Sequence, residues 1–594
     1  MCGICGELRL DGRVADLAHV GRMMARLERR GPDHEGSHSD GPLAFGHRRL
    51  SIIDLSNRSN QPLMDTDLDL VLVFNGTIYN YKELRAELVT RGYHFFSEGD
   101  SETILKAYAE WGEDCVTHLH GMFAFAIWDM KRQQLFLARD RFGIKPLYYS
   151  FARGCFRFAS TSQAILAAGG VDTGIDPIAL HHQFTLHGVV PAPRTVLRGI
   201  RKLPPGHTLT IEANGRKRLN RYWRLETRPV DHSLSEWDWV EAVRESLLRA
   251  VQRRMTVADV PVGVLLSGGL DSSLLVGLLA ESGAEDLRTF SVGFEDHPDE
   301  KGSEFEYSDQ VVERFRTRHH KFHVQNSEVL KRLPEAVDNM AEPMFGQDAV
   351  AFYLLSEQVS RHVKVVQSGQ GADEVFGGYF WYPRMDARSG SDLERFAPEY
   401  FDRDHDEWLE MVGDAYEGPD YTAARVATGM GAMGEGEFLN RVLAFDATTL
   451  IVDDPVKRVD NMTMAWGLEA RVPFLDHELV ELVASMPPEY KTGSGGKHIL
   501  KRIARGLVPD AVIDRPKGYF PVPALKFVRG EFLDFMREVV NSKACRERGL
   551  YNTGYLDRLL ADPEHQHTRL QGSKLWHQTL LEYWLQRNVD GISP

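Results

Sequence analysis

The chain has 594 residues, of which 43% are hydrophobic and 26% are charged, and its formal net charge is −15. The length predicts more than one globular domain, and the acidic balance argues against binding to nucleic acid, which needs clustered Lys and Arg. No apolar run reaches the ~20 residues that span a bilayer, and no signal-peptide pattern opens the chain, so we expect a cytoplasmic protein that binds no membrane. The five cysteines are too scattered for a disulfide scaffold.

The chain opens with MCGICGE, which places one cysteine directly behind the initiator methionine and another at position 5. Removal of Met1 would leave Cys2 with a free α-amine, whose pKa near ~8 suits it as a base for the Cys2 thiol. Zinc is the weaker interpretation, because no second pair or nearby His cluster completes four ligands. Taken alone, such a start is most often a small residue that permits removal of Met1. Cys5 is expected to be structural.

The first 225 residues alternate β-rich runs with helical stretches. LAFGHRRLSIIDL, LVLVFNGTIYNY and MFAFAIWDMKRQQLFLARD are rich in Val, Ile, Phe and Tyr, which predicts strands over 43–55, 70–81 and 122–140. YKELRAELVTRG and ETILKAYAEWGEDC space their apolar residues as helices do, over 81–92 and 102–115. We therefore predict an α+β domain dominated by sheet over residues 1–225.

A polar segment with a proline, LETRPVDHSLSEW, interrupts this pattern. We place a linker over 226–237 and a second domain over 238–594. There, strand signals in VPVGVLLS, RTFSVGF and HVKVVQS alternate with helical signals in WVEAVRESLLRAVQRRM and SSLLVGLLAESG. That alternation predicts an α/β domain with a parallel sheet covered by helices.

Four motifs follow Cys2 in order: HRRLSIIDL, QPL, FNGTIYNY and GDSE. With the cysteine they resemble the class II glutamine amidotransferases, whose glutaminase domain has the N-terminal-nucleophile fold of stacked β-sheets with helices. The resemblance implies that Cys2 attacks the side-chain amide of glutamine while Asn75 and Gly76 hold the oxyanion. It assigns the glutamine-binding site to Arg49, Leu50, Ile53, Asn75, Gly76, Thr77 and Asp100, with Arg49 on the carboxylate and Asp100 near the α-amine.

These roles suit the residue types. Thiolate attack on an amide needs hydrogen-bond donors aimed at the oxyanion. An Arg guanidinium can bind a carboxylate through two parallel hydrogen bonds. Taken singly, each residue has a plainer alternative: Arg49 as a surface charge, Asn75-Gly76 as a hairpin turn, Asp100 as a helix N-cap. One position departs from the family, which usually has FNGEIYN. Thr77 offers no carboxylate to the α-amine, so we expect lower glutamine affinity or a contact carried by Asp100 alone.

The stretch VGVLLSGGLDSSLL predicts a buried strand that ends at Ser267, a tight turn at Gly268 and Gly269, and a helix from about Asp271. Backbone N–H groups and the helix N-terminus then face one point, which suits an anion. No GK[ST] follows, so this is not a Walker loop. The plainer alternative is a strand–turn–helix with Ser and Asp as caps. SGGLDSS resembles the pyrophosphate loop of the ATP pyrophosphatases that make acyl-adenylates.

Later segments, TFSVGF, SGQGADEVFGGY and KHILK, extend this resemblance. It implies a Mg²⁺ site at Asp271 and Asp373, since Mg²⁺ takes carboxylate and phosphate oxygens. The plainer alternative for Lys497 is an exposed helix charge. LEARVPFLDHELVE also matches, and leaves Arg471 and Asp476 either structural or functional. The implied ATP-binding residues are Leu265, Ser267, Gly268, Gly269, Asp271, Ser272, Ser291, Val292, Ser368, Gly369 and Lys497.

Over nearly its whole length the chain resembles the glutamine-hydrolysing asparagine synthetase family. This implies release of ammonia from glutamine, adenylation of an acceptor carboxylate by ATP, and displacement of AMP by the ammonia. Glutamine, ATP and the acceptor would be the small-molecule partners, and a homodimer would be usual for the family. The alternative from another class is a non-catalytic sensor of glutamine or nucleotide, against which Cys2, Asp271 and Asp373 argue.

The acceptor depends on position 370. Asparagine synthetases have a Glu there that matters for the β-aspartyl-adenylate step, whereas this chain has Gln370, and an amide cannot act as a carboxylate base. HGVVPAPRTVLRGIRKLPPG, SRHVKVVQSGQGADEVFGGYFWYP and AAGGVDTGIDPIALHH resemble a related subgroup, the N-acetylglutaminylglutamine amidotransferases. That subgroup amidates the C-terminal carboxylate of an acetylated dipeptide to make a compatible solute. We therefore expect this dipeptide as the acceptor, with aspartate as the alternative.

Overall fold

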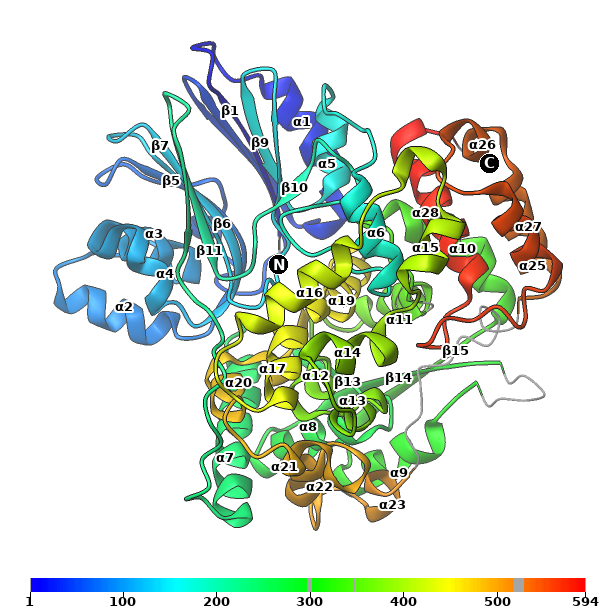
Figure 1. Cartoon of the computed structure of the whole chain (residues 1–594). Coiled ribbons are helices and arrows are strands. Elements are labelled where there is room, and N and C mark those ends of the chain that lie inside the picture. The colour runs from blue at the N-terminus through cyan, green and yellow to red at the C-terminus, as the bar shows by residue number, and fades with distance from the viewer. Residues whose placement is uncertain (1, 296–301, 347, 516–527, 593–594) are drawn as a thin grey trace.

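A computed structural model describes residues 2–295, 302–346, 348–515 and 528–592. Its N-terminal half contains two six-stranded antiparallel sheets, in the orders β10-β8-β9-β1-β3-β2 and β12-β11-β7-β6-β5-β4 (Figure 1). The strands of the first are β1 (Gly3–Arg9), β2 (His34–Asp40), β3 (Leu43–Arg49), β8 (Tyr148–Ala152), β9 (Cys155–Ala159) and β10 (Arg201–Lys202). Those of the second are β4 (Leu63–Asp65), β5 (Leu70–Ile78), β6 (Gly121–Asp129), β7 (Gln134–Arg139), β11 (His207–Glu212) and β12 (Lys217–Arg221).

The two sheets pack face to face, and helices cover their outer faces (Figure 1). Ile4, Phe45, Val73 and Trp128 belong to the fully buried layer between the sheets. The helices of this half are α1 (Leu17–Arg26), α2 (Tyr81–Thr90), α3 (Asp100–Trp111), α4 (Cys115–His118), α5 (Ser162–Ala168) and α6 (Pro177–Thr185). Because β5 is covered on both faces, it is apolar along nearly its whole length instead of alternating.

One strand prediction was wrong. Residues 50–55 do not continue β3, which ends at Arg49. The guanidinium of Arg49 binds carbonyl oxygens of the following loop, and Asp54 has a left-handed backbone (φ 48°), so these residues turn away from the sheet. The predicted run 122–140 is a hairpin of β6 and β7 rather than one strand.

The C-terminal half is built on a five-stranded parallel sheet in the order β15-β14-β13-β16-β17. Its strands are β13 (Val262–Leu265), β14 (Arg288–Phe294), β15 (Arg318–Val324), β16 (Val365–Gln367) and β17 (Glu469–Arg471). Strand order reverses between β13 and β16, and in open parallel sheets ligands bind beyond the carboxyl ends of the strands at such a point. The predicted architecture, a domain of stacked antiparallel sheets followed by an α/β domain with a parallel sheet, is confirmed.

Many helices surround this sheet (Figure 1). In the described residues they are α7 (Glu236–Thr256), α8 (Leu270–Glu281), α9 (Phe305–Phe315), α10 (Asn326–Asp338), α11 (Asp348–Ser360), α12 (Ala372–Phe376), α13 (Trp381–Asp386), α14 (Asp392–Tyr400), α15 (His405–Met411), α16 (Tyr421–Gly431), α17 (Phe438–Phe445), α18 (Ile451–Asp453), α19 (Pro455–Met464), α20 (His477–Val483), α21 (Glu489–Thr492), α22 (His498–Ala504), α23 (Asp510–Ile513), α25 (Gly530–Asn541), α26 (Lys543–Arg548), α27 (Thr553–Ala561) and α28 (Lys574–Leu585). None of the helices described is long and apolar enough to cross a membrane.

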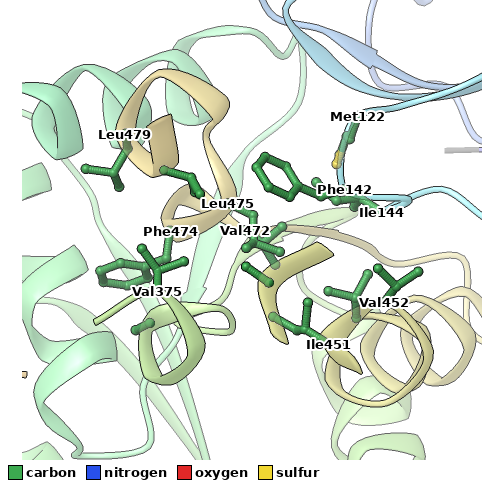
Figure 2. Packing of buried hydrophobic residues seen from close by; sticks show 14 of the residues in the cluster. Met122, Phe142, Ile144, Val375, Ile451, Val452, Val472, Phe474, Leu475 and Leu479 are labelled. Atoms are coloured by element: carbon green, nitrogen blue, oxygen red, sulfur yellow. The ribbon is translucent and has the colours of Figure 1, made fainter. Parts of the chain in front are cut away.

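The two halves share a continuous apolar core. Figure 2 shows Met122, Phe142 and Ile144 of the N-terminal half beside Val472 and Leu475 of the C-terminal half, and all five belong to one buried cluster. Burial of side chains of this size contributes about 1.5–3 kcal/mol each. The junction is therefore packed like a domain interior, and residues from both halves can meet in one site.

Candidate functional site

A small cavity lies where the ends of β1 and β5 meet the C-terminal half. Its volume is about 30 Å³, which is room for a water molecule but not for an amino acid, so a larger ligand fits only after the surrounding loops move apart. The cavity collects residues that are far apart in the sequence. Its lining includes the predicted residues Cys2, Arg49, Leu50, Ile53, Gly76, Thr77 and Asp100, together with Glu469 from β17.

Cys2 lies directly before β1 and is 7% exposed. Its backbone N–H donates to Oδ1 of Asn75 at 3.0 Å, and its carbonyl oxygen accepts from Nε of Arg30 at 3.3 Å. Burial raises the pKa of the Cys2 thiol, although the positive amino terminus and Arg49 act in the opposite direction. The thiol is thus held neutral, and its use as a nucleophile requires a base beside it.

Asn75 and Gly76 lie in β5, and the side chain of Asn75 is hydrogen-bonded to Cys2. Asn75 itself is not on the cavity wall, but its Nδ2 is buried and has no hydrogen-bond partner among the described residues, so this donor is left available to an acceptor. At Gly76 a Cβ atom would lie 2.2 Å from the carbonyl oxygen of Met122, so only glycine lets β5 approach β6 this closely. An amide donor and a glycine backbone beside a buried thiol form an arrangement that can stabilise an oxyanion.

Asp100 begins α3, with its side chain turned into the cavity wall. Its Oδ2 accepts from the backbone N–H of Ile78 at 3.0 Å, rather than capping the helix as its N-cap residue. Burial, with a contribution from the negative charge of Glu469, raises the pKa of Asp100 to about 6. The carboxylate is ionised at neutral pH but lies close to its titration range.

Arg49 has another task besides lining the cavity. Its Nη1 donates to the Ser56 carbonyl at 2.9 Å and to Oδ1 of Asn60 at 2.7 Å, and its Nη2 donates to the carbonyls of Ile53 and Asp54. The guanidinium therefore fastens the loop that covers the cavity. A ligand carboxylate would have to share Arg49 with this loop.

Sequence reasoning missed Glu469. This residue is fully buried, and its Oε1 lies 3.2 Å from the Thr77 hydroxyl and 2.6 Å from Nε of Arg471. In the LEARVPFLD segment the sequence singles out Arg471 and Asp476, which the structure places in buried ion pairs, the second with Arg254 at 2.8 Å. Glu469 belongs to this same segment, but the segment alone gives no sign of a place in the cavity, because that place depends on how β17 meets the N-terminal half.

A second cavity of about 510 Å³ opens at the carboxyl ends of β13, β14 and β16. That volume is typical of sites for nucleotide-sized ligands. Every predicted ATP-binding residue except Gly268 lines it, and so do Gln370 and Asp373. The predicted residues on its wall are Leu265, Ser267, Gly269, Asp271, Ser272, Ser291, Val292, Ser368, Gly369, Gln370, Asp373 and Lys497.

Gly268 acts on the shape of the loop instead. Its backbone has φ +80°, and a Cβ atom there would lie 2.9 Å from the backbone nitrogen of Ser308. The chain can therefore turn from β13 into α8 at once, so that the N-terminus of the helix faces the cavity. Within the loop, the Ser272 hydroxyl accepts from the backbone N–H of Ser267 at 3.2 Å.

Lys497 joins the two predicted metal ligands. Its Nζ lies 2.5 Å from Oδ2 of Asp271 and 2.8 Å from Oδ1 of Asp373, and these carboxylates raise the pKa of the Lys497 ammonium although burial opposes them. A Cβ atom at Gly378 would lie 2.1 Å from Oδ1 of Asp373, so this glycine makes the approach possible. Lys497 itself has a left-handed backbone (φ 56°), an uncommon conformation that is often found at functional sites. The two carboxylates converge on one cation, and such hard oxygen donors fit Mg²⁺.

Further acidic and basic groups in the second cavity escaped sequence reasoning. Asp348 and Glu304 are on the wall, and burial raises the pKa of both carboxyl groups. Arg515 is also on the wall, and its Nη2 lies 2.8 Å from Oε1 of Glu304. The second cavity therefore has both negatively and positively charged groups on its wall. The three residues that add them lie outside the recognisable sequence motifs.

Comparison with known proteins adds the family context. The model of a glutamine amidotransferase domain matches residues 1–223, and the model of the asparagine synthase family matches residues 242–586. Asparagine synthetase [glutamine-hydrolyzing] 3 of Bacillus subtilis is 35% identical over 547 residues, covering 88% of this chain and 87% of the relative. Asparagine synthetase 1 of the same organism is 32% identical over 636 residues, covering 99% and 97%. A putative asparagine synthetase of Mycobacterium tuberculosis is 34% identical over 649 residues, covering 98% and 97%.

Proposed function

The chain belongs to the asparagine synthase family, and we propose that its two cavities carry the two halves of one glutamine-dependent, ATP-consuming amide-forming reaction. The enzyme is a glutamine-hydrolysing ligase of the asparagine synthase type. We assign glutamine hydrolysis to residues 1–225 and amide formation to residues 238–594, joined by a linker over 226–237. The observation that carries this assignment is the buried thiol of Cys2 next to Asn75, whose Oδ1 accepts from the Cys2 N–H and whose Nδ2 has no partner among the described residues, in the half that matches the amidotransferase model.

In the first cavity Cys2 would be the nucleophile. Its own α-amine, exposed by loss of Met1, would take the thiol proton as the sulfur attacks the amide carbon of glutamine. Nδ2 of Asn75 and the backbone N–H of Gly76 would stabilise the oxyanion of the tetrahedral intermediate. The intermediate then collapses to a thioester, the departing nitrogen takes the proton and leaves as ammonia, and water hydrolyses the thioester to glutamate.

In the second cavity an acceptor carboxylate would attack the α-phosphorus of ATP, giving an acyl-adenylate and pyrophosphate. Ammonia then displaces AMP and forms the amide. The loop of Ser267, Gly269 and Ser272 would hold the pyrophosphate portion at the N-terminus of α8. Asp271 and Asp373 would hold Mg²⁺, which supplies positive charge against the phosphates when bound, and Lys497 would face the same oxygens.

For the acceptor we propose aspartate first, because the similar full-length relatives are named as asparagine synthetases. A second candidate is the C-terminal carboxylate of N-acetylglutaminylglutamine, which would make the product a compatible solute. Gln370 favours this second candidate, since it brings a neutral amide to the wall of the cavity where the family pattern has a Glu.

The acceptor is tested by ATP–pyrophosphate exchange, run separately with aspartate and with acetyl-Gln-Gln. Exchange with aspartate alone supports the first candidate and rejects the second, whereas exchange with the dipeptide alone does the reverse. The Gln370→Glu variant sharpens the result, because a new negative charge in an acceptor pocket changes the discrimination between the two compounds. An unchanged ratio for this variant would mean that position 370 does not select the acceptor.

A further inference from the structure

One carboxylate of the first cavity belongs to the other half of the molecule. Glu469 begins β17 in the parallel sheet, yet it lines the same small cavity as Cys2, Arg49 and Asp100. Its Oε1 lies 3.2 Å from the Thr77 hydroxyl, so the two side chains face each other across the junction. The cavity wall is therefore completed by the C-terminal half.

The position of Glu469 is firmly held. Nε of Arg471 donates to its Oε1 at 2.6 Å, and both side chains are fully buried. Burial opposes ionisation, but Arg471, the amino terminus and Lys145 outweigh it and lower the pKa of Glu469 to about 2. Glu469 is consequently a fixed negative charge throughout the physiological pH range.

Two carboxylates thus share a cavity of about 30 Å³. The negative charge of Glu469 acts on Asp100, because it adds to the effect of burial in raising the pKa of Asp100. Like charges in one buried site repel, and a cation placed between them relieves the repulsion. The part of glutamine that supplies such a cation is its α-ammonium group.

We infer that Glu469 is a glutamine-binding residue contributed by the C-terminal half, which holds the α-ammonium group together with Asp100 on the side of the cavity where Thr77 offers only a hydroxyl. The inference rests on the proposed glutaminase role of the first cavity. It means that the glutamine site is complete only when both halves are docked, and that Asp100 does not recognise the ammonium group alone.

Binding can be measured without turnover in a Cys2→Ala background. Titration calorimetry compares glutamine with 4-carbamoylbutanoate, which is glutamine without its α-amine. We expect Glu469→Gln to weaken glutamine binding at least about tenfold, or about 1.4 kcal/mol, and to leave the analogue unaffected. Glu478→Gln is the matched control, since Glu478 is also at the junction but is partly exposed and pairs with Arg253 at 2.7 Å outside the cavity.

Two further variants distinguish a loss of glutamine binding from a folding defect. Glu469→Asp keeps a counter-charge for Arg471 but draws the carboxylate back by one methylene, and should weaken glutamine several-fold relative to the analogue. The double variant Thr77→Glu/Glu469→Gln returns a carboxylate to the same place from the other side of the junction. It should restore most of the glutamine affinity that Glu469→Gln loses.

The outcomes distinguish a failure of the proposed glutaminase function from a failure of the role inferred for Glu469. If the Cys2→Ala protein binds no glutamine, the proposed function of the cavity is overturned, and the inference with it. If it binds glutamine but the Glu469 variants bind it as well as the parent, or weaken glutamine and the analogue equally, only the role of Glu469 is overturned. Selective loss of glutamine, recovered in the double variant, supports the inference.

Discussion

The carboxylate of Asp460 in the C-terminal half lies 2.9 Å from Nη1 of Arg30 in the N-terminal half. Its other oxygen lies 3.1 Å from Nζ of Lys145, and all three side chains are buried. Burial would raise the pKa of Asp460, but the two cations outweigh it and hold this pKa below its usual range. Because Arg30 also donates to the Cys2 carbonyl, the ion cluster connects the proposed nucleophile to the domain junction.

Replacing Asp460 by Asn should destabilise the protein by about 3–5 kcal/mol, since two buried cations lose their counter-charge. Chemical denaturation monitored by Trp fluorescence measures this loss. Because the pKa of Asp460 is depressed in the fold, its contribution should be present above the unfolded pKa of about 3.9 and disappear as the pH falls toward the folded value. The control is Asp33→Asn, which breaks the exposed junction pair with Lys364 and should cost at most about 1 kcal/mol. Equal losses for both variants would contradict the importance of the buried cluster.

Cys2→Ala should lower glutamine hydrolysis at least about 10³-fold, because no other group on the cavity wall can form the thioester. The same variant should still make the amide when ammonia is supplied directly, since the second cavity is untouched. Cys5→Ala is the control for thiol loss near the N-terminus, and should keep both activities. Retention of the initiator methionine should also inactivate the first site, and mass spectrometry of the purified chain checks which form is present. Substantial glutaminase activity in Cys2→Ala would reject the assigned nucleophile.

Lys497→Met should lower ATP–pyrophosphate exchange at least about 10²-fold, because it removes the ammonium group that bridges Asp271 and Asp373 and that would face the phosphates in the proposed site. Glutamine hydrolysis should remain near the wild-type rate. Arg502→Met, on the helix that follows Lys497 but paired with Glu236 at the surface, provides a control for loss of a cation. A variant that keeps full exchange activity would return Lys497 to a structural role.

The glutamine kcat/KM should fall as the pH drops below about 6. Burial raises the pKa of Asp100 to about 6, with Glu469 adding to the effect, so acidification neutralises Asp100 first. Glu469, with a pKa lowered to about 2, stays ionised and should preserve part of the affinity. Asp100→Asn should weaken binding at neutral pH and remove this acidic limb from the profile. An acidic limb that survives the substitution would have to come from another group.

Much of the lining of both cavities could be predicted from the sequence because the motifs that supply it are local. SGGLDSS specifies its own turn and helix start, and Gly268 is needed there for a backbone that other residues rarely adopt. Cys2 and Asp100 were placed through motifs that the fold brings together in one cavity. The prediction of a strand through residues 50–55 was wrong. Arg49 donates hydrogen bonds to carbonyl groups of this loop, and the amino-acid composition of the segment gives no sign of these bonds.

What remained hidden depends on contacts across long stretches of chain. Glu469 reaches the first cavity only because β17 docks beside Thr77, 392 residues away in the sequence. Asp348, Glu304 and Arg515 reach the second cavity from elements without a recognisable motif. The spacing of side chains within one segment carries no information about contacts between segments that are far apart in the sequence.

β17 has three residues, and its pairing with β16 matches Val365 to Glu469 and Gln367 to Arg471. Successive side chains of a strand point to opposite faces, so a slip of one residue would turn Ala470 toward the first cavity and Glu469 away from it. The same slip would break the bond from the Ser368 N–H to the Arg471 carbonyl at 2.8 Å, at the edge of the second cavity. Both sites are therefore aligned by one short ladder, and an exchange of either half with that of a relative would have to preserve its register.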